Sequence, residues 1–122
     1  MRKPWLASAA IFLVAATVTS LFFINFCATV FQCGCQSVWG LADKYCNIHA
    51  AHGRHCPWCV FGYAGYVGVY GSMLATQALV LVAGTRIGWG WLARLAAALA
   101  AFPISGLILA VALGLYTGYW NQ

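Results

Sequence analysis

The stretch LARLAAALAAFPISGLILAVALGLY, residues 92–116, decides the fold, because Arg94 is its only charged side chain. The hydrocarbon core of a bilayer is about 30 Å thick and takes about 20 helical residues to cross. Two further stretches, residues 5–27 and 58–82, are long and apolar in the same way. An unpaired backbone amide inside a bilayer costs several kcal/mol, so each stretch is expected to be a helix. We therefore predict an all-α membrane protein with three transmembrane helices.

The composition agrees with that prediction. The chain is 64% hydrophobic and 6% charged, whereas a soluble domain is about 25% charged. Its net charge of +5 comes from basic residues that lie singly between the apolar stretches and form no patch. Such spacing is typical of charges that orient a membrane protein, so we expect no binding to nucleic acid.

The apolar stretches divide the chain into five segments. Residues 1–27 are predicted as the first transmembrane helix, 28–57 as a Cys/His-rich extracytoplasmic loop and 58–83 as the second helix. Residues 84–91 are predicted as a cytoplasmic turn, and 92–122 as the third helix. The first apolar run is longer than the 7 to 15 residues typical of a signal peptide, so an uncleaved helix is expected.

Basic and aromatic residues predict the orientation. Four basic residues, Arg2, Lys3, Arg86 and Arg94, lie at the N-terminus or beside the predicted turn, which three alternating helices place on one side of the membrane. The other two, Lys44 and Arg54, lie in the predicted loop on the opposite side. The positive-inside rule places the first group in the cytoplasm. We therefore expect a bacterial inner membrane protein with a cytoplasmic N-terminus and an extracytoplasmic loop and C-terminus. Trp58 and Trp120 are expected at the outer membrane interface.

Small residues are spaced for close helix packing in two of the predicted helices. They are Gly106, Ala110, Gly114 and Gly118 in the third helix, and Gly62, Gly65, Gly68 and Gly71 in the second. Such residues let helix backbones approach each other in a membrane. The stripes predict either packing within the chain or the docking of a membrane partner subunit.

The residues with chemical potential are concentrated in residues 27–59, which contain every cysteine and every histidine of the chain. Thiolate and imidazole donors suit copper, zinc and iron, and the single acidic residue, Asp43, excludes a calcium or magnesium site. The predicted metal ligands are Cys33, Cys35, Cys46, His49, His52, His55, Cys56 and Cys59. Cys27, at the predicted membrane edge, is the least expected ligand. A transition metal, copper or zinc foremost, is the expected cofactor.

Haem is a further option, through an axial histidine. Covalent haem attachment by a Cys-x-x-Cys-His motif is excluded, because Val60 follows Cys59.

Thiol-disulfide exchange is an alternative for the same residues. Cys56-Pro57-Trp58-Cys59 lies at the predicted start of the second helix, where unpaired amides stabilise a thiolate. Cys33-Gly34-Cys35 is the candidate second pair. The Cys56 to Cys59 motif locally resembles the membrane disulfide-forming quinone oxidoreductases and the vitamin K epoxide reductase group, which implies Cys56 and Cys59 as a catalytic pair. Those bacterial enzymes tend to have an arginine after the motif that helps to hold quinone, whereas Val60 follows here.

A third alternative is a disulfide-stapled structural or accessory subunit, for which six cysteines allow 15 pairings. The leading prediction is a membrane-anchored, extracytoplasmic metal-handling protein, as a small subunit of a transport or respiratory complex. Its expected partners are membrane lipids, a membrane partner subunit, and a periplasmic thioredoxin-like or metal-carrying protein. Whether the chain is an enzyme stays open.

Overall fold

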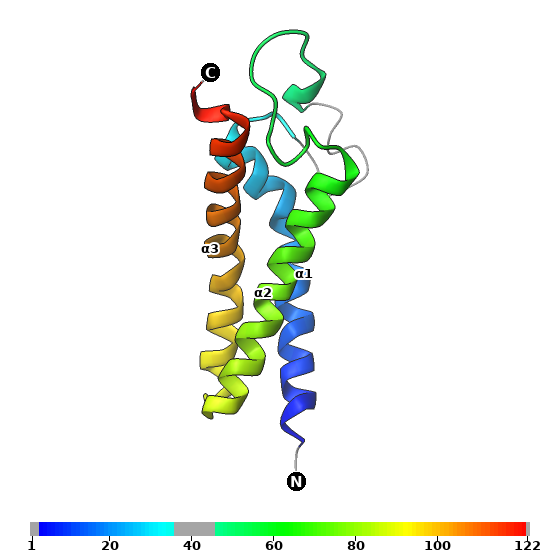
Figure 1. Cartoon of the computed structure of the whole chain (residues 1–122). Helices are drawn as coiled ribbons and strands as arrows, with labels where there is room; N and C mark the ends of the chain where they lie inside the picture. The colour runs from blue at the N-terminus through cyan, green and yellow to red at the C-terminus, as the bar shows by residue number, and fades with distance from the viewer. Residues whose placement is uncertain (1–2, 36–45, 122) are drawn as a thin grey trace.

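Three long helices form the body of the molecule in a computed structural model that describes residues 3–35 and 46–121. Helix α1 spans Pro4–Phe31, α2 spans Tyr63–Ile87 and α3 spans Trp91–Thr117, and the three lie side by side (Figure 1). Two short 3-10 turns, η2 at Asn47–His49 and η3 at Tyr119–Asn121, complete the regular structure. The described ranges contain no strand.

Each long helix has the length and composition needed to cross a membrane. The prediction of an all-helical chain with three such helices is confirmed. Several boundaries differ from the predicted ones: α2 continues to Ile87 instead of residue 83, α3 ends at Thr117 instead of residue 122, and two further differences bear on the site. Helix α1 continues to Phe31, and α2 begins only at Tyr63, since residues 57–62 form turns. Cys56 and Cys59 therefore lie ahead of α2 and not at its first turn.

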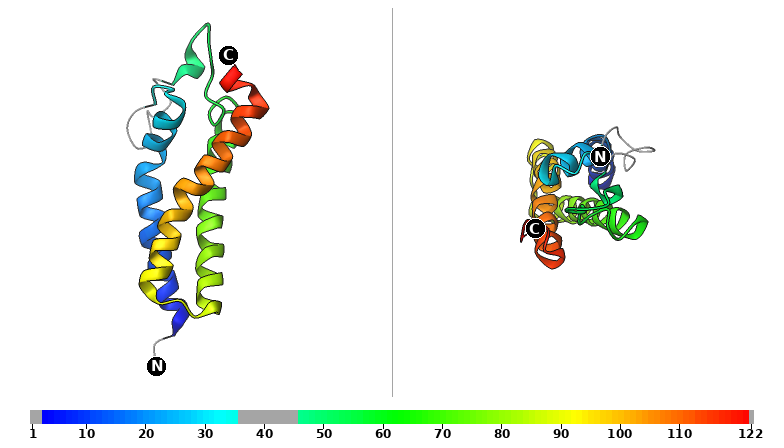
Figure 2. Two further views of the ribbon diagram at one scale, coloured as in Figure 1. Left: turned by 90° about the vertical axis from the view of Figure 1, so that its left-hand side faces the viewer. Right: turned by 90° about the horizontal axis from the view of Figure 1, so that it is seen from above.

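The ends of the chain are sorted to opposite ends of the bundle. The N-terminus lies at the same end as the turn between α2 and α3, while the Cys/His segment and the C-terminus share the other end (Figures 1 and 2). This is the arrangement expected when three helices alternate in direction. Arg2 and the loop residues 36–45, which include Asp43 and Lys44, lie outside the described residues.

Arg94 joins all three helices at the end that holds the N-terminus. It is 8% exposed, and its Nη1 donates to Ser8 Oγ of α1 at 2.7 Å and to Thr85 Oγ1 of α2 at 3.2 Å. The sequence predicts a charge that flanks the membrane, but the guanidinium lies inside the bundle. Hydrogen bonds to a charged group are among the stronger polar contacts in proteins.

Gln77 makes a second link near the middle of the bundle. Its side chain is fully buried, and Nε2 donates to Thr19 Oγ1 of α1 at 2.8 Å and to the Ala98 carbonyl of α3 at 3.0 Å. Polar side chains in an apolar bundle fix the helix register because their partners are few. The two links hold the helices in one arrangement below the Cys/His end.

The small residues of α3 pack inside the chain. Gly106 faces α1 and α2, and a Cβ atom built there would lie 2.6 Å from Phe26 Cε1 and 2.9 Å from Met73 Cε. On α2, Gly68 and Gly71 are exposed and have open space around them. The α3 stripe is therefore a packing surface of this chain, while these two glycines of α2 face outward.

These contacts predict opposite outcomes for one substitution at two glycines. Gly106→Val should force α3 away from Phe26 and Met73 and lower the free energy of unfolding by about 1–3 kcal/mol. Gly68→Val, which meets no atom, is the matched control and should change stability far less. Thermal unfolding in detergent, followed by circular dichroism, measures both; equal losses for the two variants would contradict the packing described for α3.

Candidate metal centre

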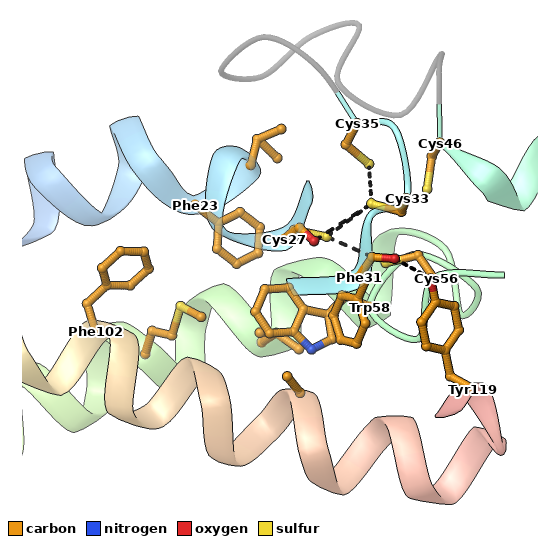
Figure 3. Packing of buried hydrophobic residues seen from close by; sticks show 14 residues of the cluster. Phe23, Cys27, Phe31, Cys33, Cys35, Cys46, Cys56, Trp58, Phe102 and Tyr119 are labelled. Carbon is orange, nitrogen blue, oxygen red and sulfur yellow. Dashed lines mark hydrogen bonds between the residues drawn. The ribbon is translucent and has the colours of Figure 1, made fainter. Parts of the chain in front are cut away.

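All six cysteines meet in one group at the end of the bundle opposite the N-terminus, and Figure 3 shows five of them, Cys59 excepted. They come from four short stretches of chain: Cys27 in the last part of α1, Cys33 and Cys35 just after it, Cys46 before η2, and Cys56 and Cys59 in the turns ahead of α2. Five are buried, and Cys59 is half-buried. The group thus joins residues up to 32 positions apart into one site.

The sulfur atoms are in contact but not bonded to each other. Cys33 and Cys35 lie 3.4 Å apart, Cys27 and Cys56 3.5 Å, and Cys27 and Cys33 3.7 Å. A disulfide bond is about 2.05 Å long. All six are free thiols, so the structure gives no support to the disulfide-stapled alternative.

Twelve pairs of sulfurs lie within 4.8 Å of each other, and four groups of three that share no pair include all twelve. The groups are Cys27, Cys33 and Cys56; Cys27, Cys35 and Cys59; Cys33, Cys35 and Cys46; and Cys46, Cys56 and Cys59. Each sulfur therefore has close neighbours on several sides, and no cysteine of the chain lies outside the cluster.

Directly after α1 the chain reverses direction and runs back along the last residues of that helix. Gln32, the C-cap residue, has a left-handed backbone with φ 50°, and Gly34 has φ 86°. Glycine takes such angles without strain, and a left-handed residue is a common way to end a helix. The reversal brings Cys33 and Cys35 back to Cys27, as Figure 3 shows.

Trp58 fixes the turn that carries Cys56 and Cys59. Its ring is fully buried and stacks on Phe23 at 5.5 Å and on Phe26 at 5.9 Å, with Phe31 edge-on at 5.3 Å. The three phenylalanines belong to α1, so the stack holds this turn against the helix that carries Cys27 (Figure 3). The ring of Trp58, which the sequence assigns to the outer membrane interface, is covered by the helices of the bundle.

Asn47 links the separate stretches of the site. Its amide N–H donates to the Cys33 carbonyl at 2.8 Å, and its Oδ1 accepts the Cys56 amide N–H at 2.6 Å. Its Nδ2 donates to the Tyr119 hydroxyl at 3.3 Å, and that hydroxyl donates to the Phe31 carbonyl. Asn47, through its backbone N–H and its side chain, thus links the segment after α1, the turn with Cys56, and Tyr119 after α3.

Contacts among the thiols and burial shift their pKa values in both directions: the pKa rises at Cys35, Cys56 and Cys59 and falls at Cys33 and Cys46. Hydrogen bonds from other thiols, that of Cys27 first and that of Cys35 next, lower the pKa of Cys33 to about 4. The pKa of Cys46 is also lowered, mainly by hydrogen bonds with the thiols of Cys33 and Cys35. A thiolate is the form that binds metal. The only acidic side chain, Asp43, is outside the described residues, so no carboxylate competes for a cation within the described site.

The three histidines do not join the thiol groups. His49 and His52 are exposed, and the half-buried His55 places Nε2 3.1 Å from the Ala50 carbonyl. His52 lines a polar cleft of about 340 Å³ beside the site, together with Asn47 and Arg54. The structure therefore brings together five of the eight predicted ligands, all cysteines, while a ligand role for the histidines stays a prediction.

Cys27 is the site residue that sequence reasoning undervalued. It is 2% exposed and belongs to two of the four groups. A signal for it exists in the sequence, because Phe23, Cys27 and Phe31 are spaced four residues apart and so share one helix face. That face is the buried one, as the low exposure of both phenylalanines shows.

No family model, curated protein or solved structure matches this chain. The fold and the site define its class: a bundle of three apolar helices of membrane-spanning length, with a six-thiol site at one end. What the site does is argued from its geometry.

The position of Asn47 makes a prediction for the metal-free protein. Asn47→Ala leaves the buried Cys56 N–H without an acceptor and removes the link to Tyr119. We expect the buried thiols to react with a maleimide about tenfold faster, the equivalent of about 1.4 kcal/mol. His49→Ala changes an exposed residue of the same 3-10 turn and serves as the control. Unchanged labelling in Asn47→Ala would show that its hydrogen bonds do not hold the site closed.

Proposed function

We propose that this chain is a membrane protein that binds a thiophilic metal ion, Cu(I) before zinc or iron, through its clustered cysteines on the extracytoplasmic side. The observation that carries the proposal is the meeting of all six cysteines, as free thiols, in one largely buried group. Structural cysteines behave as small apolar residues and have no reason to gather in this way.

The electrostatics of the group support a bound cation. Several thiolates buried together repel one another, and a buried charge is costly unless it is paired. The described residues offer little compensation, since Arg54 is exposed and lies 5.6 Å from the Tyr119 ring centroid. A soft metal cation supplies the missing positive charge and binds thiolate preferentially.

The orientation of the protein is part of the proposal. Lys3 and Arg86 lie at the end opposite the thiols, and the positive-inside rule assigns that end to the cytoplasm. The six-thiol site then faces the outer compartment, where a metal-carrying or thioredoxin-like protein has access to it. The exposed glycines of α2, Gly68 and Gly71, offer a smooth surface for a partner subunit of a transport or respiratory complex.

Thiol-disulfide exchange and haem binding have weaker support. Exchange requires a partner to reach the attacking sulfur, yet Cys56 is fully buried beside Trp58. Cys59, its partner in the Cys-x-x-Cys motif, is half-buried. The axial histidine expected for haem would be one of three histidines that lie outside the thiol groups.

Metal analysis tests the proposal. Reduced protein purified in detergent and given Cu(I) without oxygen should retain copper through gel filtration, and Cys56→Ser should retain far less. His52→Ala should retain as much as the unaltered chain if thiols alone are ligands, and a loss would give the histidine a role. Failure of the reduced, unaltered chain to retain copper, zinc or iron, with all thiols still reactive, would refute the function proposed.

Orientation is tested separately by a reporter at the C-terminus. Alkaline phosphatase, which is active only outside the cytoplasm, should be active when fused after Gln122 and inactive when fused at the end of α2. The reverse pattern would place the thiols in the cytoplasm and refute the proposed localisation while leaving metal binding in place.

A further inference from the structure

The four groups of three sulfurs share their members in a regular way. Each of the six cysteines belongs to two groups, and no pair of cysteines occurs in more than one group. Together the groups include every pair except Cys27 with Cys46, Cys33 with Cys59, and Cys35 with Cys56. Six points that each have four neighbours and one opposite are the corners of an octahedron. The four groups are one set of alternate faces of that octahedron, and the sulfurs of the other four faces also lie within 4.8 Å of one another.

This arrangement has the connectivity of a four-metal cage. A metal ion at each of the four faces would have three sulfur ligands, and each sulfur would bridge two ions. A thiolate sulfur has the lone pairs for two metal bonds. We infer, on the basis of the proposed function, that the six cysteines hold four Cu(I) ions in one Cu4S6 cluster.

The sulfur spacing fits three-coordinate ions. A metal–thiolate bond of about 2.3 Å, as in zinc sites, separates three sulfurs in a plane around the ion by about 4.0 Å. The shortest contacts of the free thiols are 3.4 to 3.7 Å, and all pairs within a group are under 4.8 Å. Small outward movements of the sulfurs are enough to seat an ion in each face.

The same geometry disfavours a single zinc or iron ion. A structural zinc site is tetrahedral and needs four donors that are all mutual neighbours. Each group here has three members, and any four corners of an octahedron include an opposite pair. Cu(I) accepts three thiolates in a plane and is the soft ion that fits these faces.

Charge balance is also favourable for the cage. Four Cu(I) ions bind with release of six protons from six thiols, and no oxidation or reduction takes place. The product carries a net charge of −2 shared over ten atoms, whereas one Cu(I) with three thiolates carries the same charge on four. Spreading the charge reduces the penalty of burial in a site lined by Trp58 and Phe31.

The inference is tested by copper stoichiometry in the full chain. Reduced protein in detergent is titrated anaerobically with the Cu(I)–acetonitrile complex, and copper per chain is measured by elemental analysis after gel filtration. We expect a plateau at four, with empty and four-copper species dominating native mass spectra. X-ray absorption should show a short copper–copper distance besides the copper–sulfur shell. A plateau at one, without a copper–copper distance, overturns the cage but leaves metal binding intact; absence of any bound copper overturns the proposed function itself.

Variants separate the cage from a smaller site. Cys27 and Cys59 each belong to two faces, so Cys27→Ser and Cys59→Ser should each lower the plateau from four to two. Cys59 is only half-buried, so its variant is the safer for folding, which the helix signal in circular dichroism checks. Ser72→Ala, on the exposed face of α2, is the control and should stay at four. A plateau of four in both cysteine variants would overturn the inference.

Discussion

The stacking of Trp58 on α1 is the contact on which the site depends. The indole lies between Cys56 and Cys59 in sequence and against Phe23 and Phe26 in space. It therefore sets the distance between the turn before α2 and the end of α1, which carries Cys27. Buried aromatic pairs contribute about 0.5–1.5 kcal/mol beyond the area they bury. The Trp58 stack supplies this stabilisation where the turn before α2 meets the end of α1, so it favours contact between the sulfur atoms of these two distant segments.

The bundle below the site supplies a rigid base. Gln77 and Arg94 link all three helices at two levels, and Gly106 lets α3 approach the side chains of Phe26 and Met73. Phe26 also stacks on Trp58. The packing of α3 against Phe26 therefore helps to position the turn that carries Cys56 and Cys59. The preorganisation of the site thus begins well inside the predicted membrane region.

The sequence predicts the three helices because bilayer thickness and backbone hydrogen bonding leave few alternatives, and it predicts the cysteine site from composition. His49, His52 and His55 are spaced three residues apart, but this segment forms no continuous helix, since η2 ends at His49 and Gly53 has φ 102°. The burial of Cys27 and Trp58 was not predicted from the sequence, because it depends on a chain reversal at Gln32 and on stacking between distant segments. The four-residue spacing of Phe23, Cys27 and Phe31 indicates a shared helix face, but the reversal and the stacking do not appear in local periodicity.

Free thiols and the proposed extracytoplasmic location are in tension, because oxidising compartments convert adjacent thiols to disulfides. Six sulfurs in contact are well placed for that reaction, yet the structure holds them as thiols with Cys27 and Cys56 buried. Coordination resolves the tension, since a sulfur whose lone pairs bind metal is a poorer nucleophile toward another disulfide or an oxidant. A cluster that uses every sulfur twice leaves none unprotected, whereas a single ion would leave at least two thiols open to oxidation. The octahedral arrangement and the proposed orientation therefore support the same conclusion, that the site is filled as a unit.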